Sequence, residues 1–188
     1  MSHIYSKAIS RRRAGLTLIE TMVSLAITSS LLVAVAAAYN ASASAVTANA
    51  DFFKATQAAR ITMNQMLSEI RQAESVQVYS DHIDIIRPTA NMAVDPSLGT
   101  EVFRRFQYDA TNSRITLQIF YGASSTPGTL YEMATNLSSV NFGPAMMGRD
   151  WNNTLVVQHV PITLNLKVGK DFVNLSGSAG PRRAQQSF

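Results

Sequence analysis

The 188-residue chain contains no cysteine. This absence excludes disulfide bonds, thiolate metal ligands, a cysteine nucleophile and a lipid-bearing cysteine. Histidine is also scarce, with three residues in the whole chain. The sequence lacks a glycine-rich phosphate loop, a serine nucleophile elbow and a zinc-binding HExxH motif. We therefore expect no catalytic site and no enzymatic activity.

A surplus of positive charge is missing from most of the chain, although the formal net charge is +4. Residues 1–15 hold four of the 16 basic residues and no acidic residue. This leaves 12 basic and 12 acidic residues in residues 16–188, which are formally neutral. A nucleic-acid-binding domain usually carries a basic patch or stripe. The distribution argues against nucleic acid as a partner.

Proline and glycine are absent from residues 16–75. The first part of this stretch, residues 16–39, is apolar apart from Glu20 and scattered hydroxyl groups. As a helix it extends about 36 Å, enough to cross a hydrocarbon core of about 30 Å. The basic cluster before it predicts that the N-terminus stays in the cytoplasm and that the rest of the chain is exported.

A cleaved secretory signal peptide is an alternative interpretation of this segment. A basic start, an apolar core and small-residue sites at Ala36–Ala38 and Ala43–Ala45 fit that class. However, the apolar run is longer than the about 7–15 residues that are typical of such peptides. Glu20 also places a charge inside the run. A charge within a membrane segment is costly and indicates a functional role with a specific partner.

The stretch AGLTLIETMVSLAI, Ala14–Ile27, resembles the N-terminal signature of type IV pilins and pseudopilins. In that signature a short basic leader ends in glycine, and an apolar helix follows with glutamate at its fifth position. Gly15 matches the glycine, Leu16 the first mature residue and Glu20 the glutamate. The resemblance implies cleavage by a prepilin peptidase between Gly15 and Leu16, followed by N-methylation of Leu16. Most members begin with phenylalanine or methionine, and Leu16 departs from that while remaining apolar.

The resemblance also implies a partner for Glu20, the N-terminal amine of a neighbouring subunit. Cleavage creates a positive amine at Leu16, and unpaired charges are expensive in a medium of low dielectric constant. Placing the amine of an incoming subunit beside Glu20 removes much of that penalty and sets the axial register. Further implied partners are other pilin or pseudopilin subunits, an inner-membrane assembly platform and a cytoplasmic ATPase.

The second part of the proline-free stretch, residues 40–75, has the pattern of an amphipathic helix. Its apolar residues recur every three or four positions and share one face; they are Phe52, Ala55, Ala59, Met63, Met66 and Ile70. We therefore expect one helix from Leu16 to about Glu74. Its first half is apolar all round, and the stripe on its second half is expected to pack on a sheet.

The remaining residues, 76–188, alternate with the period of two that is typical of strands and form the predicted β-rich head. We expect a strand pair in residues 76–88 and hairpins around Ala110–Ser113 and Gly169–Asp171. Residues 129–144 read as one extended stretch, and residues 145–153 as irregular with Trp151 as a loop anchor. Pro161 indicates an edge strand or a break. The predicted fold class is α+β, a long helix packed on a mostly antiparallel sheet.

The histidines are candidate metal ligands. His82 lies beside Asp81 and Asp84, which could be drawn as a metal cluster, but exposed positions on an edge strand explain the pattern better. His159 is expected to be an ordinary strand residue, and His3 to leave with the leader. No loop has the alternating acidic pattern of a calcium site. We therefore expect no metal and no cofactor.

The resulting domain division is a leader in residues 1–15, a membrane and filament-core helix in 16–39, its amphipathic half in 40–75, and the head in 76–188. The leading hypothesis is a structural subunit of a type IV pilus or a type II secretion pseudopilus, most similar to a minor, tip-associated or priming subunit. Before assembly it would cross the inner membrane once, with the head outside the cytoplasm. The alternatives are a filament-borne adhesin or DNA-uptake module, and an exported enzyme with a signal peptide or a membrane anchor.

Overall fold

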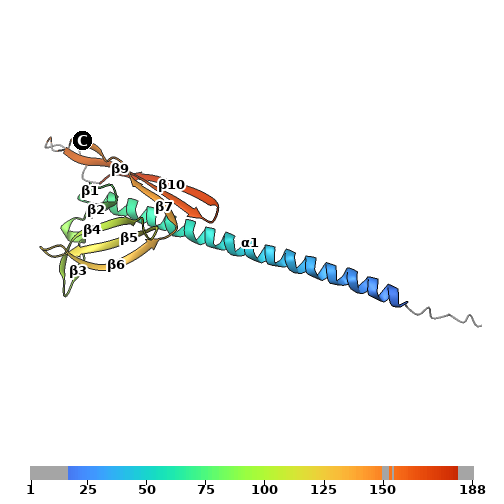
Figure 1. Cartoon of the computed structure of the whole chain (residues 1–188). Coiled ribbons are helices and arrows are strands. Elements are labelled where there is room, and N and C mark those ends of the chain that lie inside the picture. Colours follow the sequence, from blue (N-terminus) through green and yellow to red (C-terminus); the bar gives the residue numbers. More distant parts are fainter. Residues whose placement is uncertain (1–16, 150–152, 154, 182–188) are drawn as a thin grey trace, which may run out of the picture. The chain divides into compact units, whose positions relative to one another are not determined.

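The computed structural model describes residues 17–149, 153 and 155–181 (Figure 1). The chain divides into two compact units on either side of the Thr47–Ala48 bond. One helix, α1 (Leu18–Gln72), begins in the first unit and ends in the second. The predicted long helix is therefore present, and it ends two residues before the expected Glu74.

In the first unit, α1 is apolar around its whole circumference and its side chains are exposed; Leu18 is 79% exposed and Val33 70%. Six of its hydroxyl groups are bonded within the helix. The Thr21 hydroxyl donates to the carbonyl of Leu18 at 2.8 Å. The same type of bond is made by Thr28, Ser29, Ser30, Ser44 and Thr47. Because these hydroxyls need no water, they are compatible with a lipid environment.

In length and composition α1 qualifies as a membrane-spanning helix, and its most apolar window has no residue buried against the rest of the chain. A helix that is hydrophobic on all sides must be covered by something other than water. The first unit is therefore suited to a membrane or to a bundle of similar helices.

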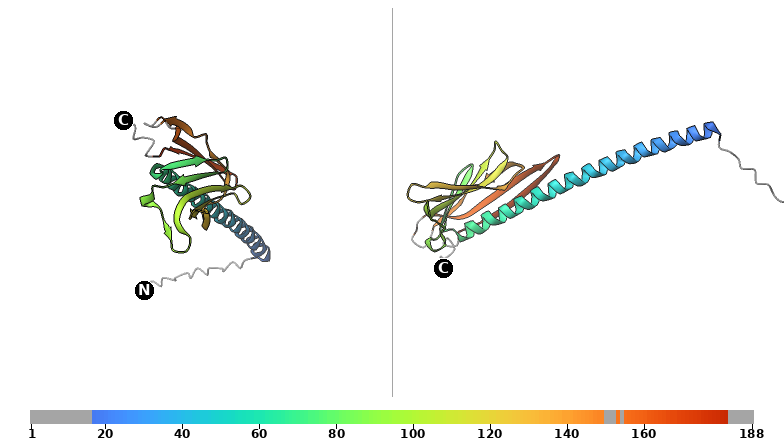
Figure 2. Two further views of the ribbon diagram at one scale, coloured as in Figure 1. Left: turned by 90° about the vertical axis from the view of Figure 1, so that its left-hand side faces the viewer. Right: turned by 90° about the horizontal axis from the view of Figure 1, so that it is seen from below.

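The second unit contains two antiparallel sheets (Figures 1 and 2). The first sheet has the order β1-β2-β4-β5-β6, with β3 paired to β4. Its strands are β1 (Ser75–Val78), β2 (His82–Ile86), β3 (Val94–Asp95), β4 (Gly99–Asp109), β5 (Arg114–Tyr121) and β6 (Thr126–Ala134). The second sheet has the order β10-β9-β7, with β8 paired to β9. Its strands are β7 (Leu137–Phe142), β8 (Met146–Arg149), β9 (Leu155–Val168) and β10 (Asp171–Ala179). A short 3-10 helix, η1, covers Thr89–Asn91.

The α+β class is confirmed, as are the strand pair and both hairpins, but the head has two sheets where a single sheet was expected. Residues 129–144 were predicted as one extended stretch. The structure divides them into β6 and β7, which belong to different sheets. Asn136 lies between these strands with φ of 61°, a left-handed conformation that asparagine tolerates better than most residues. The predicted irregular segment 145–153 contains β8, and Trp151 lies outside the described residues.

Pro161 does not mark an edge or a break of its own strand, contrary to the prediction. β9 runs through Pro161 with β10 beside it on one side. On the other side its neighbour changes here, from β7, which ends opposite Ile162, to β8, which begins opposite His159. The Gly143 N–H donates to the Pro161 carbonyl on that side at 2.9 Å. The proline nitrogen, which has no hydrogen to donate, therefore faces the gap between β7 and β8.

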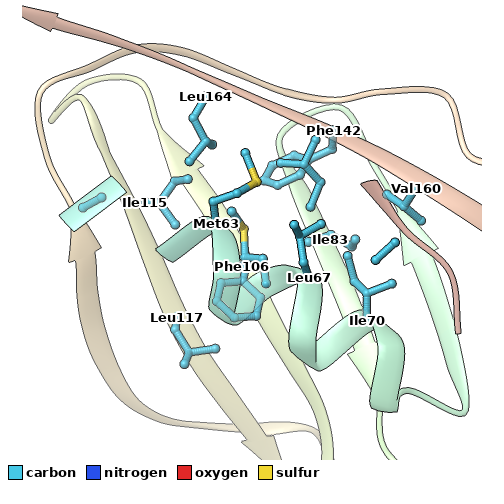
Figure 3. Close-up of a cluster of buried hydrophobic side chains, with 14 of the residues drawn as sticks. Met63, Leu67, Ile70, Ile83, Phe106, Ile115, Leu117, Phe142, Val160 and Leu164 are labelled. Carbon is cyan, nitrogen blue, oxygen red and sulfur yellow. The ribbon is translucent and has the colours of Figure 1, made fainter. Parts of the chain in front are cut away.

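The core forms where the amphipathic half of α1 meets both sheets (Figure 3). Five of the six predicted stripe residues are buried, and Phe52 is half-buried. Thr62 and Leu67 are buried as well, so the packed face is wider than the stripe. A Cβ atom at Gly177 of β10 would lie 2.8 Å from Leu67 Cδ1 and 3.4 Å from Met63 Sδ. The bare glycine backbone therefore lets β10 approach the helix closely.

A cluster of ion pairs joins α1 to the first sheet. Arg104 of β4 binds Glu101 through Nε at 2.7 Å and Glu69 of α1 through Nη1 at 2.8 Å. The Glu101 side chain is fully buried, and its second oxygen accepts the Ala93 N–H at 2.8 Å. Burial by itself lowers the pKa of Arg104, but the hydrogen bond to Glu101 and the charge of Glu69 outweigh it and raise the pKa. The cluster therefore fixes the last turns of α1.

We predict that Leu164→Ala destabilises the head strongly, because Leu164 of β9 is fully buried in the core that α1 forms with the sheets. The expected loss in the free energy of unfolding is about 2–5 kcal/mol, measured by chemical denaturation. Leu155→Ala on the same strand is the matched control, since Leu155 is 61% exposed. Its effect should stay within about 0.5 kcal/mol. Equal losses in the two variants would contradict the assigned core.

We also predict that Arg104→Met destabilises the head, because it leaves the Glu101 carboxylate buried without its cation. Breaking a buried pair in this way costs about 3–5 kcal/mol of unfolding free energy. Arg114→Met removes ion pairs to Asp109 and Glu132 that are more exposed, so it should change stability little. Denaturation curves that shift alike for the two variants would show that the Glu101 pair is not structurally important.

Candidate assembly site at the start of the long helix

The first turn of α1 is closed by a capping box between Thr17 and Glu20. The Thr17 N–H donates to Glu20 Oε2 at 3.4 Å, and the Glu20 N–H donates to Thr17 Oγ1 at 3.3 Å. Such reciprocal bonds satisfy two backbone donors that a helix start leaves unpaired. The carboxylate also lies at the positive end of the helix dipole, where negative charge is favoured. Glu20 thus caps the start of the helix, in addition to its predicted role as the partner of an N-terminal amine.

Sequence reasoning missed the contribution of Thr17. The signal was available, since a threonine followed three residues later by glutamate before an apolar run is the pattern of a capping box.

The charge of Glu20 has no basic partner along the described part of the helix. Glu20 is the only charged residue in residues 17–50, and its side chain makes no ion pair within the described residues. The capping bonds use one carboxylate oxygen and neutralise no charge. A cation for Glu20 must therefore come from outside residues 17–50. An N-terminal amine at Leu16, of this chain or of a neighbour, has the required sign.

Gly15 and Leu16, the predicted cleavage and methylation residues, lie outside the described residues. Their roles therefore stay predictions.

The structure does bring His82, Asp81 and Asp84 together on the first sheet. His82 Nδ1 lies 2.8 Å from Asp81 Oδ1, and its Nε2 lies 3.9 Å from Asp84 Oδ2. Asp84, however, binds the guanidinium of Arg105 with both oxygens at 2.8 Å. The hydrogen bond from His82 lowers the pKa of Asp81, and the bond to Asp84 raises that of Arg105. These side chains therefore bind one another. No set of side chains that could hold a metal ion is found among the described residues.

The surroundings of this cluster correct one expectation. The side chains of His82 and Asp84 are only 15% and 10% exposed, although exposed positions were predicted. The ring of Tyr79 stacks on that of His82 with 4.3 Å between the ring centres, and Arg105 binds both oxygens of Asp84. The Arg105 guanidinium in turn lies 5.1 Å from the ring centre of Phe120 and 5.5 Å from that of Phe103. His159 is an ordinary strand residue on β9, as expected.

A family model described as the prokaryotic N-terminal methylation motif matches residues 10–36. Comparisons with curated proteins and with solved structures found no match. The matched range includes Gly15, Leu16 and the capping box of Thr17 and Glu20, and it reaches well into the apolar part of α1. The chain therefore carries the N-terminal signature of type IV pilins and pseudopilins, which marks it as a membrane-anchored substrate of a prepilin peptidase that assembles with other pilin-type subunits.

Proposed function

We propose that this protein is a non-catalytic subunit of a type IV pilus or of a type II secretion pseudopilus. The observation that carries the proposal is Glu20, which is the only charge in residues 17–50 and lies at the start of an apolar helix within the matched methylation motif. Such a helix is stable in lipid, and it is equally stable in a bundle of similar helices. The charge then provides the specific contact that lipid lacks.

Glu20 would act in two steps. In the membrane-bound subunit the carboxylate caps its own helix through the long hydrogen bonds with Thr17. After cleavage, the amine of an incoming subunit would pair with the same carboxylate, since attraction between opposite charges is strong where water is excluded. A one-residue change in axial position moves the amine by about 1.5 Å. The pair would therefore select one register between neighbouring helices.

We further propose that the protein is a minor subunit at the tip or in the priming complex. The basis of this assignment is the sequence pattern of the head, in which repeated hairpins follow the long helix. In this proposal the N-terminus faces the cytoplasm and the head lies beyond the inner membrane. An assembly platform in that membrane would then deliver the subunit into the filament.

The first test is the mature N-terminus. Mass spectrometry of the chain from cells with a prepilin peptidase should show a protein that begins at N-methylated Leu16. Gly15→Val should yield the uncleaved precursor, because a branched side chain replaces the small residue before the cut. A mature chain that begins near Tyr39 or Val46 would instead indicate a signal peptidase and contradict the proposal.

The second test separates the charge of Glu20 from its capping role. Glu20→Gln keeps a side chain that can complete a capping box but removes the charge. Glu20→Ala removes both. We expect both variants to be cleaved normally and to be lost from the filament fraction to a similar extent. Normal filament entry by Glu20→Gln alone would show that capping, and not pairing with an amine, is the important contact.

A further inference from the structure

We propose that the free edge of β10 binds an extended strand of a neighbouring subunit and so adds a strand to the second sheet. The inference rests on the proposed function, because it requires that the chain enters a filament. It concerns the head, however, and not the N-terminal helix.

The hydrogen-bonding pattern shows which backbone groups of β10 are free. The Gly143 N–H donates to the Pro161 carbonyl, and the Lys167 N–H donates to the Asn136 carbonyl. The backbone N–H and C=O groups of odd-numbered residues of β9 therefore point toward β7. The backbone groups of even-numbered residues of β9 then point toward β10, because these groups alternate between the two sides along a strand.

Their partners on β10 use their own backbone groups in that pairing; they are Val173, Leu175, Gly177 and Ala179. The intervening residues direct their N–H and C=O groups to the open border; they are Phe172, Asn174, Ser176 and Ser178. These four residues are exposed, and their backbone makes no hydrogen bond to another strand or loop of the described chain.

The other borders of the two sheets carry features that discourage strand addition. β1, β3 and β8 have four, two and four residues. β6 contains Pro127 and Glu132 and shifts register twice against β5. β7 shifts register once, and Leu137 bonds to the first sheet.

β10 lacks all of these features. Its nine residues pair with β9 in unbroken register, they include no proline, and their only charge is Asp171 at the first position. A long, regular and uncharged edge is a template for another strand. Of the described borders, β10 is therefore the one open to pairing.

The side chains along β10 specify the chemistry of the partner strand. Val173 and Leu175 point to the core and are only partly buried, so apolar residues beside them would complete their burial. Asn174 and Ser176 lie on the outer face and are neutral, and the Asn174 amide donates to Asn165 Oδ1. The fitting partner alternates apolar and uncharged polar residues. Nucleic acid does not fit, because it requires basic side chains.

Ser176 allows a sharp test on the full-length protein in cells that assemble filaments. Ser176→Pro removes an N–H that faces the border, while Ser176→Ala keeps it. Proline is tolerated at an edge where the N–H faces solvent, so the head should still fold. We expect the proline variant to enter the filament fraction about tenfold less than the alanine variant, as the loss of a backbone bond and the clash of the ring imply.

A second pair of variants keeps the test valid if the proline variant does not fold. Ser176→Lys places a charge at the border, whereas Thr163→Lys places it directly opposite on the central strand β9. Both changes lie on the outer face and alter the net charge alike, although Thr163 is half-buried and Ser176 is exposed. Only Ser176→Lys should reduce filament entry. Equal reduction by both variants would overturn the inference.

Hydrogen–deuterium exchange provides the direct readout. The amides of residues 174, 176 and 178 should exchange rapidly in the membrane-solubilised chain and slowly in filaments. Slow exchange in the free chain would show that the edge is already covered and would overturn the inference. Entry of Ser176→Pro equal to that of the wild type would overturn the inference alone. Absence of the wild-type chain from filaments would overturn the proposed function as well.

Discussion

The unpaired charge of Glu20 is the constraint on which the N-terminal unit depends. It lies in a helix that offers it hydrogen bonds but no cation. The other polar side chains in that part of the helix are uncharged, and several of them bond to the helix backbone, so the carboxylate is the only charge that can distinguish one axial position from another. Apolar packing by itself would let such helices slide. In the proposed assembly, the fixed position of this single charge would give neighbouring helices one axial register.

In the second unit the same helix has a different role, because it forms part of the hydrophobic core. Here one face of α1 is covered by two sheets, and the ion cluster of Arg104 fixes its end. Both sheets need the helix, because each has an apolar face that would otherwise meet water. The glycine at position 177 shows how closely the second sheet approaches. The head therefore depends on burial, and the N-terminal unit depends on what surrounds it.

Sequence periodicity predicted the long helix and most of the strands, but not β8 or the grouping of the strands into two sheets. The stripe from Ala55 to Ile70 and the alternation in β9 follow from burial on one side, which a single sequence records directly. The division into two sheets depends on the left-handed turn at Asn136, and asparagine also occurs in ordinary loops. The prediction of an edge or a break at Pro161 was wrong because a proline fits within β9 where its neighbour changes from β7 to β8. The capping role of Thr17 could be predicted from its spacing to Glu20, whereas the burial of His82 depends on the stacked ring of Tyr79, which the sequence alone does not place there.

Three successive hydroxyl residues in α1 have a mechanical consequence. Thr28, Ser29 and Ser30 each donate to a carbonyl of the preceding turn. Such bonds compete with the ladder of backbone hydrogen bonds and are associated with helix bending. Bending stiffness should therefore be lowest around these residues. A bundle of such helices should bend most readily at this level.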